Sequence, residues 1–97
     1  MIELLCKAIQ EKRVLIILYK GQGRIIEPHL TGQKRSGNDA LSAWQVGGYS
    51  ESNRQPPWRN YLLSEIENIQ VLDQFFDNPR EGFNPNDKTM SHIYCHV

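Results

Sequence analysis

Apolar positions near the start of the chain predict one helix followed directly by a buried strand. Ile2, Leu5 and Ile9 recur at helical spacing, which predicts an amphipathic helix over about residues 2–12. Residues 14–19 are apolar on both faces and rich in β-branched side chains, as is typical of a strand covered on both sides.

Short apolar stretches between polar turns predict several more strands. The turn at 20–23 predicts a hairpin to a strand at 24–27, and Pro28 marks a strand end, an edge or a bulge because proline donates no ladder hydrogen bond. The apolar stretches predict strands at 40–46, 58–63 and 69–72, a helical turn at 64–67, and an alternating terminal strand with Ile93, Cys95 and Val97 on one side. Polar loops are expected at 32–39 and 49–57.

These elements predict a mainly β fold with one N-terminal helix, curled into a small barrel. We expect a single barrel domain over 1–72 and a turn-rich C-terminal extension over 73–97, packed on or beside it. Trp44 and Trp58 are also predicted to be core residues, because a small barrel needs large side chains. The rest of the predicted core is Leu5, Ile9, Leu15 or Ile17, Ile25, Leu41 and Leu62.

Charge and cysteine content bound the class of protein. The net charge is zero, which argues against a protein that coats nucleic acid by electrostatics alone. Residues 1–60 carry nine Lys and Arg against five Asp and Glu, a net of +4, and residues 61–97 carry two against six, a net of −4. This asymmetry indicates either a basic binding face or ordinary surface charge. With no signal peptide and no long apolar run, we expect a cytoplasmic, non-membrane protein in which Cys6 and Cys95 are free thiols.

The search for catalytic or metal-binding residues finds no convincing set. His29 stands without a neighbouring nucleophile or acid and is interpreted as a surface or hydrogen-bonded side chain, so no enzyme is expected. His92, Cys95 and His96 are metal-ligating types, but a strand would point Cys95 away from both histidines. The prediction is therefore no metal and no cofactor.

Basic and aromatic residues interleave along the predicted strands, a pattern typical of small barrels that hold nucleotides or single-stranded nucleic acid. The alternative is that Arg24 pairs with Glu27 or Glu65, and Arg59 with an acid of the tail. Guanidinium, hydroxyl and amide donors together suit an anion. The predicted ligand-binding residues are Arg24, Gln45, Ser50, Ser52, Arg54 and Arg59.

Several segments, in order, resemble the WYL domain family. They are the leading helix, the strand ending in Tyr19, Arg-Ile-Ile-Glu-Pro at 24–28, and the stretches 41–52, 57–66 and 79–87. The Trp-Tyr-Leu signature itself is replaced by Ala-Leu-Ser-Ala-Trp at 40–44. The resemblance implies a five-stranded SH3-like or Sm-like barrel. It also implies a role in bacterial transcription regulation or defence, sensing nucleotides or nucleic acid through basic residues.

Two functions follow from these observations. The first is a non-enzymatic regulatory module that binds an anionic ligand, either a nucleotide or single-stranded nucleic acid. The alternative is a domain that binds a protein partner or a second copy of itself through an exposed strand edge.

Overall fold

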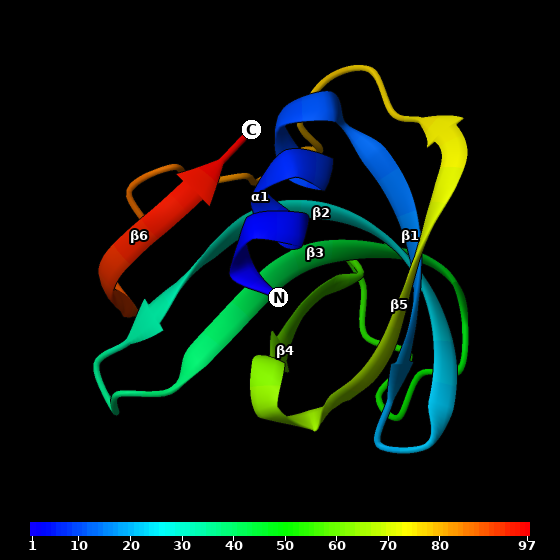
Figure 1. The fold of residues 1–97 in the computed structure, drawn as a ribbon, viewed down its shortest axis with the longest axis horizontal. Coiled ribbons are helices and arrows are strands. Elements are labelled where there is room, and N and C mark those ends of the chain that lie inside the picture. Colours follow the sequence, from blue (N-terminus) through cyan, green and yellow to red (C-terminus); the bar gives the residue numbers. More distant parts are fainter.

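A curved antiparallel sheet of six strands and one N-terminal helix make up the computed structural model, which describes residues 1–97 (Figure 1). The prediction of a mainly β fold with one leading helix is confirmed. No helix is long and apolar enough to cross a membrane. The elements are α1 (Ile2–Glu11), β1 (Arg13–Tyr19), β2 (Gln22–Lys34), β3 (Asp39–Gly48), β4 (Trp58–Leu62), a 3₁₀ turn (Leu63–Glu65), β5 (Ile66–Phe75) and β6 (Met90–His96).

The sheet curls but does not close into the predicted five-stranded barrel. Its strand order is β4-β3-β2-β1-β5, so β4 and β5 lie at opposite ends of the hydrogen-bonded path, and β6 is a sixth strand paired with β2. The physical reason is that β4 has only five residues and pairs only with β3, while the 3₁₀ turn after it leads β5 to the edge of β1 away from β2. Strand β2 pairs with β1 over residues 22–26 and with β6 over residues 30–34. The C-terminal segment is thus part of the sheet, and β5 continues past residue 72.

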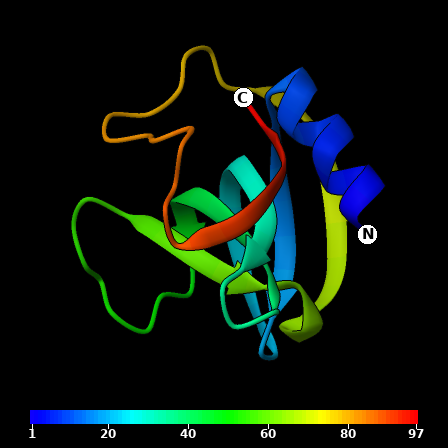
Figure 2. The same cartoon turned by 90° about the vertical axis from the view of Figure 1, so that its left-hand side faces the viewer.

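The helix forms where the apolar spacing predicted it. Leu5, Ala8 and Ile9 are buried against the sheet, and the helix ends at Lys12, whose left-handed backbone (φ 54°) lets its N–H bond to carbonyls of the last turn. Figures 1 and 2 show α1 lying against the sheet beside the end of β6. Helix packing on the sheet, rather than isolated helix propensity, holds this ten-residue element.

Strand β2 is longer than predicted because Pro28 marks a bulge and not an end. The register with β3 shifts between Pro28 and Leu30, and the strand then continues to Lys34, which shortens the expected 32–39 loop to a turn at 35–38. A bulge tolerates a residue without an N–H. Gly32 lies against the backbone of β6, where a Cβ would overlap the His92 carbonyl.

The predicted core is correct for Leu5, Ile9, Leu15, Ile17 and Leu41 and wrong at four positions. Ile26 and Tyr61 are buried where Ile25 and Leu62 were expected. Ile26 lies opposite the buried Leu15 of β1 and Tyr61 opposite the buried Leu41 of β3, so the next residue along each strand faces the other side. Trp44 and Trp58 are also outside this core and only half-buried, since they alternate to the other face of β3 and β4. The core cluster is Leu5, Ala8, Ile9, Leu15, Ile17, Tyr19, Ile26, Leu41, Ala43, Tyr61, Leu63 and Ile66.

The expectation of free thiols is wrong. Cys6 on α1 and Cys95 on β6 form a disulfide that spans 89 residues of sequence. The docking of β6 onto β2, beside the helix, brings the two sulfur atoms together. That proximity depends on the tertiary fold, which the spacing of the two cysteines does not reveal.

Candidate anion-binding site

A pocket of about 190 Å³ lies at one end of the curled sheet, between the β1–β2 hairpin, loop 49–57 and β4. It contains four of the six predicted ligand-binding residues: Arg24, Ser50, Ser52 and Arg59. The residues that line it are Tyr19, Lys20, Arg24, Ser50, Glu51, Ser52, Arg59, Asn60 and Tyr61.

Arg24 is a buried cation without a carboxylate partner. It is only 4% exposed and makes no ion pair. Its guanidinium carbon lies 5.2 Å from the ring centres of Tyr19 and Tyr49 and 5.9 Å from that of Tyr61, and Nη2 donates to the Tyr19 carbonyl at 3.3 Å. Nε is buried with no hydrogen-bond partner. Aromatic faces and one carbonyl therefore hold a charge that no acid neutralises.

Arg59 is the second cation of the pocket, and the loop together with β4 occupies most of its donors. Nη1 donates to the Trp58 carbonyl at 3.0 Å, while Nη2 donates to Ser50 Oγ at 3.2 Å and to the Arg54 carbonyl at 3.0 Å. Its Nε is buried and unpartnered. Arg59 makes no ion pair with the tail, and Arg24 makes none with Glu27, which pairs with Arg80 instead.

Tyr61 adds no negative charge to the pocket. Burial raises the pKa of Tyr61 to about 12, although Arg24 and Arg59 pull it in the opposite direction. The phenol is consequently neutral at physiological pH, and its hydroxyl lies 3.4 Å from Gln45 Oε1. The only carboxylate lining the pocket is that of Glu51, which is exposed and forms no ion pair. The pocket is therefore net positive.

The other two predicted residues lie near the pocket but do not line it. Gln45 is buried beneath the loop, where Nε2 donates to the carbonyls of Gly47 (3.0 Å) and Tyr49 (2.7 Å). Arg54 is exposed and contributes its backbone carbonyl to Arg59. Gln45 thus positions the start of the loop and Arg54 lies within it.

Sequence reasoning missed Tyr19, Lys20, Glu51 and Asn60 as lining residues, and it counted Tyr61 only among the aromatics that interleave with the basic residues. The strand period carried a usable signal, because Arg59 and Tyr61 are two residues apart and must share a face of β4. Tyr19 and Lys20 lie at the end of β1 and in the turn beside Arg24, which the predicted hairpin had already brought together. Asn60 had no such signal.

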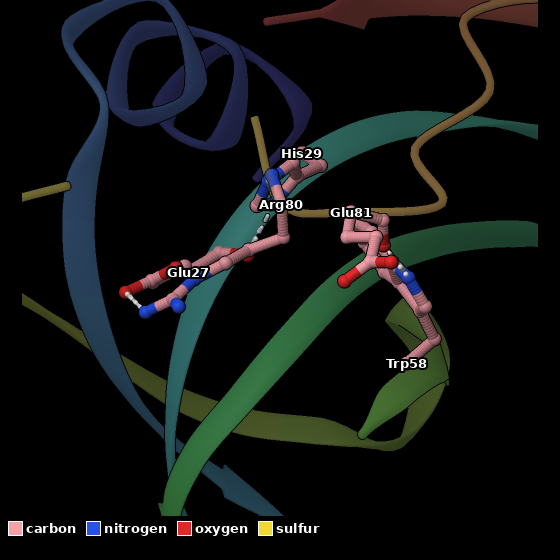
Figure 3. Close-up of polar contacts among 5 residues, drawn as sticks. All are labelled: Glu27, His29, Trp58, Arg80 and Glu81. Carbon is pink, nitrogen blue, oxygen red and sulfur yellow. Dashed lines mark hydrogen bonds and ion pairs between the residues drawn. The ribbon is translucent and has the colours of Figure 1, made fainter. Parts of the chain in front are cut away.

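A second polar cluster fastens the C-terminal segment to β2 and β4. His29 is fully buried, and its Nε2 accepts from the Arg80 backbone N–H at 3.0 Å, so Nδ1 carries the proton and donates to the Glu27 carbonyl at 2.8 Å (Figure 3). The Arg80 side chain forms a two-pronged ion pair with Glu27, at 2.7 and 2.9 Å, and Trp58 Nε1 donates to the Glu81 carbonyl at 2.9 Å. His29 is therefore a hydrogen-bonded structural residue.

This second polar cluster predicts that the protein loses stability in acid. Burial, together with the positive charge of Arg80, lowers the pKa of His29 below its ordinary 6.5, although the Glu27 carbonyl and carboxylate oppose the shift. The unfolded chain takes up a proton near pH 6.5 and the folded chain resists, so stability is lost as the pH falls below that value. The expected slope is at most about 1.4 kcal/mol per pH unit from this residue.

The test is urea unfolding between pH 7.5 and 5.5 for the wild type and for His29→Gln, which cannot titrate. The exposed His92 and His96 are present in both proteins and cancel in the comparison. The wild type should lose stability more steeply in acid than the variant. Equal slopes would show that His29 does not couple folding to pH.

The structure brings together no group of three or more His, Cys, Asp or Glu side chains that could hold a metal ion. Two guanidiniums, an ammonium and two hydroxyls around one pocket are instead a donor set for an oxyanion such as phosphate. A scan against protein-family models, a search of curated proteins and a search of solved structures each found no match for this chain.

Proposed function

We propose that this chain is a non-enzymatic sensing module that binds an anionic ligand, a nucleotide or single-stranded nucleic acid, in the pocket between Arg24 and Arg59. The observation that carries the proposal is the burial of Arg24 without an acid partner. A buried charge is costly unless it is paired, and a bound anion would provide the missing partner.

The composition of the pocket supports a phosphate-bearing ligand. Arg24 and Arg59 supply positive charge, and Ser50 and Ser52 add hydroxyl donors without adding charge. A pocket of about 190 Å³ suits a phosphate group better than a whole nucleotide. Arg24 lies over the ring of Tyr49, and because Tyr49 is 46% exposed, a base outside the pocket could stack on the remaining ring surface.

The curled sheet also supports kinship with SH3-like barrels, as the resemblance to the WYL family implies. In a closed five-stranded barrel the two ends of the β4-β3-β2-β1-β5 path would pair, and here they remain open. We propose an open variant of that barrel, acting as a regulatory module of bacterial transcription, with β6 as an added strand.

The test is binding of a single-stranded oligothymidylate of about ten nucleotides at two salt concentrations. Arg59→Ala should bind more weakly than the wild type, and its slope of log affinity against log salt should be shallower by ~0.7 for one lost phosphate contact. Arg35→Ala is the matched control, because Arg35 is exposed and lies in the turn at the other end of β2. Fluorescence anisotropy of a labelled oligonucleotide measures both quantities.

No binding by the wild type at low salt, or an Arg59→Ala slope equal to that of the wild type, would overturn this proposal. The second candidate is then a protein-interaction or self-assembly domain. Its support is β5, an edge strand of ten residues with Val71 and Phe75 exposed at 42% and 57%. Analytical ultracentrifugation of the wild type and of Phe75→Lys tests it, since only an edge-mediated dimer should dissociate in the variant.

A further inference from the structure

The loop over the candidate pocket has few attachments to the rest of the molecule. Figure 2 shows loop 49–57, in green, projecting away from the sheet. Backbone hydrogen bonds anchor its two ends, from Tyr49 to Gly23 and from Gln45 to Pro57. Residues 51–56 between these anchors are all exposed.

Within the loop, serine hydroxyls stabilise two local turns. Ser50 Oγ accepts from the Asn53 N–H at 3.4 Å, and Ser52 Oγ accepts from the Arg54 N–H at 3.3 Å. These bonds connect the loop only to itself. They give it a local shape but do not attach it to the sheet.

Arg59 is the one side chain outside the loop that hydrogen-bonds to it between the anchors. Its Nη2 atom donates to Ser50 Oγ and to the Arg54 carbonyl, two points on opposite sides of the loop tip. The partially buried guanidinium thus connects the loop to β4. Without it, the segment between the anchors would keep only its internal turns.

The donors of Arg59 are nearly all committed in this state. A guanidinium has five N–H groups. Two of them on Nη2 and one on Nη1 are engaged, and the Nε–H is buried out of reach of solvent. One Nη1–H therefore remains for an incoming oxyanion. A two-pronged contact, which guanidinium prefers with phosphate, requires Nη2 to leave the loop.

We infer that Arg59 is a latch for loop 49–57, and that an anion bound at the proposed site releases the loop by taking over Nη2. This inference rests on the proposed function. Release of the loop would be the structural change by which ligand binding is signalled to the rest of a regulatory system. The buried charge of Arg24 favours the exchange, because it attracts the anion and no carboxylate neutralises it. Ligand occupancy and loop release are then one event.

Cleavage at Glu51 by a glutamyl endopeptidase measures the release, because proteolysis follows the population of the open loop when opening is fast. The probe is the same oligothymidylate, at a concentration that saturates the protein in the anisotropy assay. Saturated wild type should be cleaved at least about fivefold faster than free protein, since one hydrogen bond corresponds to about fivefold in an opening equilibrium. Cleavage at Glu81, which lies in the C-terminal segment and is hydrogen-bonded to Trp58, should not change.

Two arginine variants separate the latch from general loosening, and neither changes the residues next to the cleaved bond. Arg59→Ala removes both bonds to the loop and should raise cleavage of the free protein at Glu51 at least about fivefold. Arg35→Ala is the matched control, because Arg35 is exposed, lies outside the loop and should leave the rate close to that of the wild type. Equal rates for the two variants would overturn the latch.

The remaining outcomes distinguish the latch from the proposed function. Binding of the oligonucleotide with an unchanged or slower cleavage at Glu51 would overturn the latch and leave the binding function standing. No binding by the wild type would overturn the function and its regulation together. Faster cleavage at both Glu51 and Glu81 would show general destabilisation and would also contradict the inference.

Discussion

Reduction of the bond between Cys6 and Cys95 should lower the free energy of unfolding by about 4–5 kcal/mol. The disulfide closes a loop of 89 residues in a chain of 97, so it restricts nearly the whole unfolded ensemble. The entropy lost by an unfolded chain grows with the length of the closed loop. Domains are stable by only about 5–15 kcal/mol, so this single bond is a large part of the total.

Urea unfolding with and without a reductant measures the effect. A double variant, Cys6→Ser with Cys95→Ser, is the control, because it should match the reduced wild type and should not respond to the reductant. A change below about 1 kcal/mol in the wild type would contradict the prediction. The reduced protein should also lose order first at β6, which the disulfide holds beside α1.

Truncation of Leu5 to alanine should destabilise the protein by about 2–5 kcal/mol. Leu5 is fully buried in the cluster that joins α1 to the inner face of the sheet. Removing its branched end loses apolar burial and leaves a cavity that the rigid sheet cannot fill. The effect should appear in the midpoint of urea unfolding without a change in its slope.

Leu4→Ala is the matched control, since Leu4 lies on the same helix but is 44% exposed. Its expected effect is within about 0.5 kcal/mol. Equal effects of the two substitutions would show that α1 does not dock through the face described. Both variants keep the disulfide, so the comparison reports on packing alone.

Strand β4 connects the two polar clusters of the molecule. Arg59 points into the candidate pocket, whereas the ring of Trp58 lies on the other face and donates to the tail at Glu81. The Trp58 carbonyl also accepts from Arg59. The pocket and the tail therefore contact two consecutive residues, Arg59 and Trp58. A change in either should alter the surroundings of the Trp58 ring, so Trp58 fluorescence is a suitable probe of both.

The candidate site could be predicted in part from the types of residue and their order. Arg24, Ser50, Ser52 and Arg59 lie around one pocket, as a donor set for an anion requires. Gln45 and Arg54 were predicted to line the pocket and do not, because proximity along the chain does not specify which way a side chain points. The unpaired state of Arg24 was beyond prediction, since it depends on Glu27 being engaged by Arg80, 53 residues away.

The amino-acid sequence by itself determined the helix, its buried face, most strands and the loop at 49–57. These features depend on side-chain period and turn chemistry within a few residues, where local preferences and burial agree. Tertiary structure alone decided the path of β2 beyond Pro28, the inward phase at Ile26, the pairing of Cys6 with Cys95, and the burial of His29 under Arg80. Each of these depends on contacts between segments far apart in the chain, which become definite only when the sheet curls and β6 docks on β2.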